Sequence, residues 1–199
     1  MGILNKIFKS NRLKKISQFF LVPNSSILEI GVHKGDFSLQ ILKKFKPQRL
    51  ILVDPWIYKL DEIYKSSLYG GSIQEEKGQL IQNQYYQNLK NTLKNEIQIG
   101  KVEIIRKKSS EAFKQLKEKF DMIYIDGNHL YDFVLEDLIN SLEKINNNGL
   151  IVCDDYKHKG WWNDGVTKAI EFLEKNKKIK IIHEHNFFNR HHQCIIKKI

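Results

Sequence analysis

The chain has 199 residues, of which 41% are hydrophobic and 28% are charged, and its formal net charge at pH 7 is +10. This length and composition are typical of one globular domain with a sizeable core. The excess of basic residues lies at the two ends of the chain, because residues 21–155 are nearly neutral. A nucleic-acid site would need basic groups gathered on one face, so nucleic acid is a disfavoured partner.

The chain has no apolar run of about 18 residues and no secretory signal pattern, so we expect a cytoplasmic protein that does not span a membrane. Its two cysteines, Cys153 and Cys194, both lie in apolar runs. They lack the spacing of a zinc site, so we predict buried free thiols.

Residues 1–22 are predicted to form a basic amphipathic helix. Apolar residues share one of its faces, and Lys and Arg occupy the other. The apolar face either packs against its own domain or a partner subunit, as most do, or lies on an anionic membrane surface through residues 1–20. Pro23 and the polar residues after it separate this helix from a domain that spans residues 23–199.

Short apolar runs alternate with helical patterns from residue 27 onward. Strands are predicted at 27–31, 50–54, 102–106, 122–126, 150–154, 179–183 and 193–197, and helices near 36–44, 109–117, 131–142 and 166–174. This alternation predicts an α/β fold, a doubly wound Rossmann-like sheet with helices on both faces. Residues 57–100 are an insert that we expect to contain a helix and a cap over a substrate. Its tyrosines either line that site or pack within the insert (Tyr64, Tyr69, Tyr85 and Tyr86).

The run Ile27–Ser38 joins the first strand to a helix through a loop with Gly31 and Gly35. Glycines allow the backbone to approach a ligand closely, although tight packing turns look similar. The loop is not G-x-G-x-x-G, which disfavours a dinucleotide. Asp54 ends the second strand, where a carboxylate either binds ribose hydroxyls or caps a turn. Together these features favour a nucleoside-type cofactor.

Three carboxylates follow the ends of two later strands, namely Asp126, Asp154 and Asp155. Neighbouring strand ends would bring them together, and their repulsion would raise their pKa values unless a cation lies between them. Oxygen ligands suit Mg²⁺, Mn²⁺ or Ca²⁺, whereas separate caps and turns are the alternative. His129 follows Asp126 by three residues and could reach the same cleft, where a neutral imidazole can act as a general base. Such a histidine more often only donates or accepts hydrogen bonds.

These motifs resemble those of class I methyltransferases that use S-adenosylmethionine (SAM), in the metal-dependent O-methyltransferase branch. That branch includes macrocin and mycinamicin sugar O-methyltransferases and cephalosporin-hydroxylase-like proteins. The resemblance covers about residues 27–175. Glu29-x-Gly31 with Gly35 matches the first SAM motif, and Asp54 matches the ribose-binding acid. The branch is indicated by three further runs: Asp126-Gly-x-His129-x-Tyr131, Gly149 to Asp154-Asp155-Tyr156, and Gly165-Val-x-x-Ala169.

The resemblance implies a seven-stranded, mostly parallel sheet with an antiparallel last strand, and methyl transfer from SAM to a hydroxyl of a sugar or related small metabolite. It implies Mg²⁺ at Asp126, Asp154 and Asp155, with His129 and Asp126 as catalytic residues. The expected cofactor residues are Glu29, Gly31, Gly35, Ser38, Asp54, Ser109, Ser110 and Asp126. The expected acceptor residues are Trp56, Tyr131, Tyr156, Trp161 and Trp162. The alternatives are a hydroxylase-like reaction on the same fold, or a non-catalytic protein that binds nucleic acid or a membrane.

Overall fold

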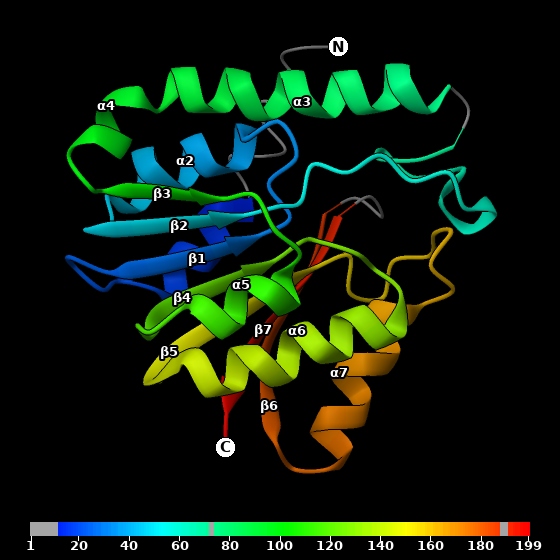
Figure 1. Cartoon of the computed structure of the whole chain (residues 1–199). Coiled ribbons are helices and arrows are strands. Elements are labelled where there is room, and N and C mark those ends of the chain that lie inside the picture. Colours follow the sequence, from blue (N-terminus) through cyan, green and yellow to red (C-terminus); the bar gives the residue numbers. More distant parts are fainter. Residues whose placement is uncertain (1–11, 72–73, 188–190) are drawn as a thin grey trace.

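The computed structural model describes residues 12–71, 74–187 and 191–199, and its centre is a seven-stranded sheet (Figure 1). The strands are β1 (Ser26–Ile30), β2 (Arg49–Val53), β3 (Val102–Ile105), β4 (Phe120–Ile125), β5 (Ile145–Asp154), β6 (Ile179–Phe187) and β7 (His191–Lys198). They lie in the order β3-β2-β1-β4-β5-β7-β6. The first five are parallel, and β7 runs antiparallel to both of its neighbours, β5 and β6. The predicted fold class is confirmed.

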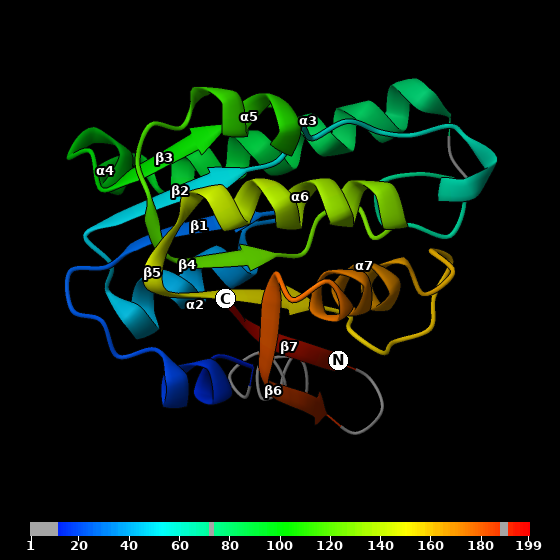
Figure 2. The same cartoon turned by 90° about the horizontal axis from the view of Figure 1, so that it is seen from below.

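Helices cover both faces of the sheet (Figure 2). They are α2 (Asp36–Phe45), α3 (Glu75–Thr92), α4 (Lys94–Gln98), α5 (Ser109–Gln115), α6 (Tyr131–Lys144) and α7 (Gly165–Lys175). Alternate strand residues face opposite sides, so Leu28 belongs to the buried cluster that includes residues of α5, α6 and α7, while Ile27 belongs to the cluster that includes residues of α2 and α3. Burial on both faces explains why the strands read as continuous apolar runs.

The predicted strands and helices lie close to the observed ones, with two exceptions. Strand β5 begins at Ile145, where it already pairs with Phe120, and β6 continues to Phe187 in a hairpin with β7. Polar residues occupy both extensions, so the apolar pattern did not reveal them. Cys153 and Cys194 lie opposite each other in β5 and β7, and both are buried free thiols, as predicted.

The insert contains more regular structure than the sequence indicated. After β2 the chain forms an irregular segment, residues 57–71, which includes a short 3-10 turn, η1 (Glu62–Tyr64). Helix α3 then runs above the sheet, and α4 returns the chain to β3 (Figure 1). Leu89 and Leu93 anchor α3 and the turn after it to the core, although most of the α3 side chains are polar.

Residues 12–19 are helical, and this segment packs on the same face of the sheet as α2. Leu13, Ile16 and Phe20 are all buried. The described part of the predicted amphipathic helix therefore packs against its own domain. The rest, including Ile3, Leu4, Ile7 and Phe8, lies outside the described residues, so membrane contact stays a prediction. Within the described ranges, every helix is too short or too polar to cross a bilayer.

Candidate functional site

A cleft of about 610 Å³ lies beyond the carboxyl ends of β1, β2, β4 and β5. In open α/β sheets this is where ligands bind. Eleven of the residues that the sequence predicted for the site line it: Glu29, Gly31, Asp54, Ser109, Ser110, Asp126, His129, Asp154, Asp155, Trp161 and Trp162. These predicted residues therefore lie together in one cleft, and the individual side chains show what each can do there.

The loop between β1 and α2 is shaped by its two glycines. Gly31 has φ +85°, and a Cβ there would lie 2.0 Å from the backbone oxygen of Asp126. Gly35 has φ +79° at the start of α2, where a Cβ would lie 2.3 Å from a methyl group of Leu89. Backbone contacts therefore require Gly31, whereas at Gly35 it is the positive φ that favours glycine, because the Leu89 side chain could move. Gly35 does not line the cleft. The predicted contact of both glycines with a cofactor stays a prediction.

The Asp54 carboxylate joins the end of β2 to this glycine loop. Its Oδ2 accepts hydrogen bonds from the backbone N–H groups of Val32 and His33, each at 2.9 Å. Its Oδ1 accepts one from the N–H of Trp56 at 2.7 Å. Burial raises the pKa of Asp54, and the three backbone donors oppose that rise. A carboxylate offers about four acceptor positions, so capacity remains for a hydroxyl in the cleft.

Glu29 is a second buried carboxyl in this part of the cleft. It is 1% exposed, and its Oε2 has no hydrogen-bond partner among the described residues. Burial raises its pKa to about 8. A positively charged ligand group could be accommodated beside it once Glu29 ionises. Ser38, also predicted to bind the cofactor, is fully buried on α2 and does not line the cleft.

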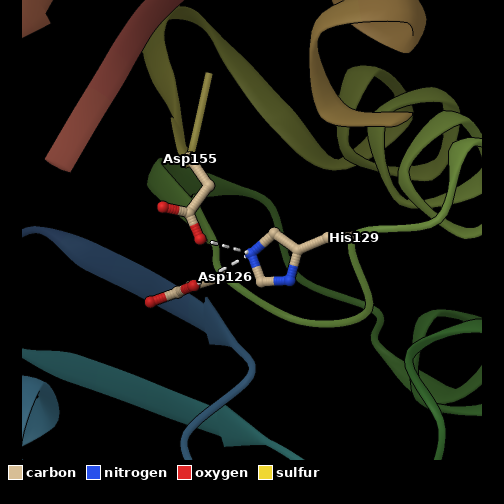
Figure 3. A group of neighbouring side chains, drawn as sticks. All are labelled: Asp126, His129 and Asp155. Carbon is tan, nitrogen blue, oxygen red and sulfur yellow. Dashed lines mark ion pairs between the residues drawn. The ribbon is translucent and has the colours of Figure 1, made fainter. Parts of the chain in front are cut away.

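The ends of β4 and β5 form the acidic centre, which we define as Asp126, His129, Asp154 and Asp155. His129 Nε2 lies 3.4 Å from Asp126 Oδ1 and 3.1 Å from Asp155 Oδ2 (Figure 3). Asp155 follows β5 directly and has φ +58°, so the chain turns sharply at this residue. One oxygen from each of these two aspartates and the His129 nitrogen all lie within 4.8 Å of one another.

The third predicted metal ligand, Asp154, is held differently. It is 4% exposed, and its Oδ2 accepts a hydrogen bond from Nη1 of Arg12. The same Nη1 lies 3.3 Å from the Tyr124 hydroxyl and 4.0 Å from Asp126 Oδ2. Arg12 is not among the residues that the sequence predicted for the site. A signal was available, because Arg12 stands four residues before Ile16, on the buried face of its helix.

The acidic centre changes the protonation of His129. Burial disfavours the charged imidazolium, but the nearby carboxylates of Asp126 and Asp155 outweigh burial and raise the pKa of His129 to about 10. In this arrangement the imidazole is protonated at neutral pH. It can therefore act as the predicted general base only after another cation compensates the two carboxylates.

Aromatic rings form one wall of the cleft beside the acidic centre. The ring centroids of Tyr64 and Trp161 are 5.4 Å apart, those of Tyr69 and Trp161 are 6.1 Å apart, and Trp162 lies 4.7 Å from His129. Asn128 donates a hydrogen bond of 3.0 Å to the Tyr64 hydroxyl. This bond connects the irregular segment after β2 to the loop that carries His129.

Three predicted acceptor residues do not line the cleft. Trp56 is fully buried, and its Nε1 donates a hydrogen bond to the His33 carbonyl. Tyr156 is 3% exposed in the core, and Tyr131 packs against that core at the start of α6. These rings pack in or against the core, where large aromatic side chains bury more apolar surface than smaller ones. Tyr85 and Tyr86 likewise pack beside the core from α3.

The fold and the position of the cleft define a Rossmann-like protein of the methyltransferase type, and comparisons with known proteins support this class. A family model described as "Methyltransferase domain" matches residues 28–156. The chain belongs to this methyltransferase family. A sequence search of curated proteins finds no match.

Solved structures share the fold at low sequence identity. A candidate rRNA methylase from Clostridium thermocellum has a TM-score of 0.65 at 12% identity, with 96% of each chain covered. The SAH-bound methyltransferase PaMTH1 of Podospora anserina has a TM-score of 0.62 at 16% identity, covering 88% of this chain and 72% of that one. A candidate methyltransferase from Streptococcus mutans, solved with SAH, has a TM-score of 0.60 at 13% identity, covering 90% and 91%.

Proposed function

We propose that this chain is a SAM-dependent O-methyltransferase that methylates a hydroxyl of a sugar or related small metabolite with the help of a divalent metal. The observation that carries the proposal is the convergence of Asp126, His129 and Asp155 in the same cleft as Glu29, Gly31 and Asp54. The residues proposed to bind the cofactor and those proposed to activate an oxygen nucleophile therefore line the same cleft.

The cofactor part rests on the fold family and on Asp54. Two of the related structures contain SAH, the product that SAM leaves after methyl transfer. Asp54 keeps acceptor capacity toward the cleft, which suits the hydroxyls of a ribose. Glu29, when ionised, suits the α-amino group of the methionine portion. Ser109 and Ser110 line the cleft at the start of α5 and are proposed to lie near the cofactor.

The side chains of the acidic centre fit a divalent ion. Neighbouring ligand atoms around an octahedral ion are about 3 Å apart when each bond is about 2.1 Å. The nitrogen-to-oxygen distances of 3.1 and 3.4 Å are close to that spacing. Two carboxylates with one imidazole suit Mn²⁺ or Fe²⁺, whereas the three carboxylates of Asp126, Asp154 and Asp155 suit Mg²⁺. Asp126 and Asp155 would hold the ion, and either His129 or Asp154 would complete the set.

A divalent ion here would lower the pKa of a hydroxyl that it coordinates. The protein's own groups orient the acceptor and receive its proton. His129 accepts that proton where Asp154, rather than His129, completes the ligands of the ion, because the ion then compensates the carboxylates and the pKa of the imidazole falls. The acceptor oxygen forms a bond to the methyl carbon as the bond from that carbon to the sulfonium breaks. The products are a methyl ether and S-adenosylhomocysteine, and the proton leaves to His129 or to solvent.

The aromatic wall supports a sugar-like acceptor. Tyr64, Tyr69 and Trp161 contact one another and line the cleft, and aromatic side chains of this kind offer an apolar surface against which the C–H groups of a sugar ring pack. Trp162 lies against His129, so a ring held by this wall would place a hydroxyl near the acidic centre.

The proposal is tested with purified protein in two measurements. Calorimetric titration with SAM is expected to show binding to the wild type and to Asp155→Ala. Incubation with labelled SAM and a panel of sugars and glycan extracts is expected to label an acceptor with the wild type, and at least about a hundredfold less with Asp155→Ala or in EDTA. Absence of SAM binding ends the methyltransferase proposal, and full transfer in EDTA ends the metal role.

A further inference from the structure

Arg12 occupies the acidic centre as a cation that belongs to the chain itself. Its side chain is 9% exposed, and its guanidinium lies against the Phe37 ring, 4.9 Å from the ring centroid. The helix that carries it is anchored by Leu13, Ile16 and Phe20. The guanidinium therefore reaches Asp154 from a docked helix rather than from a loose segment.

Structural stability alone gives a weak reason for this contact. Two charges lose hydration when they are buried, and replacing a buried ion pair with apolar residues is often neutral or stabilising. The pair is also incompletely satisfied, because Nε of Arg12 and Oδ1 of Asp154 have no hydrogen-bond partner among the described residues. Such an arrangement suits a contact that another ligand can replace.

A divalent ion and Arg12 compete for the same carboxylates. Asp154 Oδ2 already accepts from Arg12, and Asp126 Oδ2 lies 4.0 Å from the same nitrogen. A divalent ion bound to these carboxylates and the Arg12 guanidinium are both positively charged. At such distances they repel strongly in a site that is largely removed from water. An ion that takes Asp154 as a ligand must therefore displace the guanidinium. An ion that binds only Asp126, His129 and Asp155 still gains affinity if Arg12 moves away.

We propose that Arg12 competes with the divalent ion for the acidic centre, so that ion binding releases the N-terminal helix from the site. The inference rests on the metal role in the proposed function and adds a regulation of that site. The coupling is reciprocal: docking of residues 12–19 weakens ion binding by the same factor by which the ion weakens docking. When no ion is bound, the docked helix keeps Arg12 beside the carboxylates and so compensates their charge.

The first test measures Mn²⁺ affinity by electron paramagnetic resonance. Arg12→Gln removes the competing charge and is expected to bind Mn²⁺ at least about tenfold more tightly than the wild type. Arg12→Lys keeps the charge but loses the planar guanidinium, so its affinity should lie between those of the wild type and Arg12→Gln. Arg49→Gln is the matched control, because Arg49 pairs with Glu103 and Glu118 outside the cleft, and it should leave the affinity unchanged. Arg12→Met also removes the charge and should bind Mn²⁺ as tightly as Arg12→Gln. Circular dichroism of every variant checks that it folds.

The second test follows helix docking directly. Mn²⁺ is expected to accelerate amide hydrogen exchange in residues 12–19 of the wild type and to leave exchange in α6 unchanged. Equal Mn²⁺ affinity in the wild type, Arg12→Gln and Arg12→Met, or unchanged exchange in residues 12–19 at saturating Mn²⁺, overturns this inference and leaves the metal role standing. Absence of Mn²⁺ binding in every variant overturns both.

Discussion

In the two halves of the cleft, different groups offset the negative charge of the carboxylates. In the cofactor half, formed by the β1–α2 loop and the end of β2, Asp54 accepts hydrogen bonds from three backbone N–H groups. In the acidic half, at the ends of β4 and β5, the compensating groups include the side chains of Arg12 and His129. Both halves lie at the same edge of one sheet, so the difference arises from the segments that surround that edge rather than from the strands.

This difference predicts different behaviour. Backbone donors cannot leave without a change in the fold, so the cofactor half is formed before any ligand arrives. Side-chain cations can be exchanged for another cation, so the acidic half can change its occupant while the sheet remains intact. Substitutions in the cofactor half should therefore alter stability, and those in the acidic half should mainly alter ion binding and catalysis.

The largest effect on stability is expected from Gly31→Ala. The new Cβ would overlap the Asp126 carbonyl, 2.0 Å away, and φ of +85° is strained for alanine. Left-handed strain and overpacking together cost about 4 kcal/mol of unfolding free energy. Urea unfolding at pH 7 measures the loss.

Gly100→Ala is the matched control for that substitution. Gly100 also has a positive φ, +73°, but a Cβ there would meet nothing within 4 Å. Only the backbone strain remains, so the expected loss is about 1 kcal/mol. If both substitutions lowered the unfolding free energy equally, the close approach of Gly31 to the Asp126 backbone would not contribute to the stability of the cofactor half.

The fold was predictable from sequence because each strand is a short apolar run followed by a turn or a polar residue. Leu28 and Ile123, for example, are fully buried, and the pattern that reveals them depends on nothing distant in the chain. Helix α3 was predicted only as a helix somewhere in the insert, since its surface is mostly polar and two leucines near its end attach it.

The candidate site was only partly predictable. Residues that directly follow strand ends, such as Asp54 and Asp126, lie in the cleft because chain direction alone puts them there. Arg12 stands 142 positions before its partner Asp154. Its place on the buried face of its helix indicates burial, but no local pattern identifies Asp154 as its partner. Trp56 also follows a strand end, but φ of +46° and its hydrogen bond to His33 direct the ring into the core.

Glu29 allows a sharper test, because it is the carboxyl of the cofactor half with an unpartnered oxygen in the described structure. Burial raises its pKa to about 8, well above the ordinary value of 4.5. Between these values the folded state retains a proton that the unfolded state releases, so stability falls as pH rises from about 4.5 to 8. Relative to Glu29→Gln, the wild type should lose on the order of 3 kcal/mol between pH 4.5 and pH 9.

Urea unfolding of both proteins across this pH range measures that difference. Glu29→Gln removes the titration and keeps the size of the side chain, so its stability should depend less on pH than that of the wild type. Parallel curves for the two proteins would show that Glu29 is ionised in the folded state and that its oxygen has a partner.

The smallest effect compares one substitution in the two halves. Asp54→Asn converts an acceptor of three backbone N–H bonds into a group with one acceptor oxygen and one NH₂ donor, which leaves at least one buried N–H opposed to a donor. The expected cost is about 2 kcal/mol. Asp155→Asn removes one charge from a group of like charges, and asparagine tolerates φ of +58°, so its unfolding free energy should change by less than about 1 kcal/mol.

Unfolding and SAM binding of the two variants, measured in EDTA, and Mn²⁺ binding, measured without it, decide whether the two halves differ. Asp54→Asn should lower the unfolding free energy and weaken SAM binding, because the loop that Asp54 holds is also the predicted cofactor loop. Asp155→Asn should keep both near the wild-type values and lose Mn²⁺ binding. If Asp155→Asn instead destabilises the protein as much as Asp54→Asn, its carboxylate is a fixed structural group like Asp54. The acidic half would then be as rigid as the cofactor half, and exchange of Arg12 for an ion would need the sheet edge to reorganise.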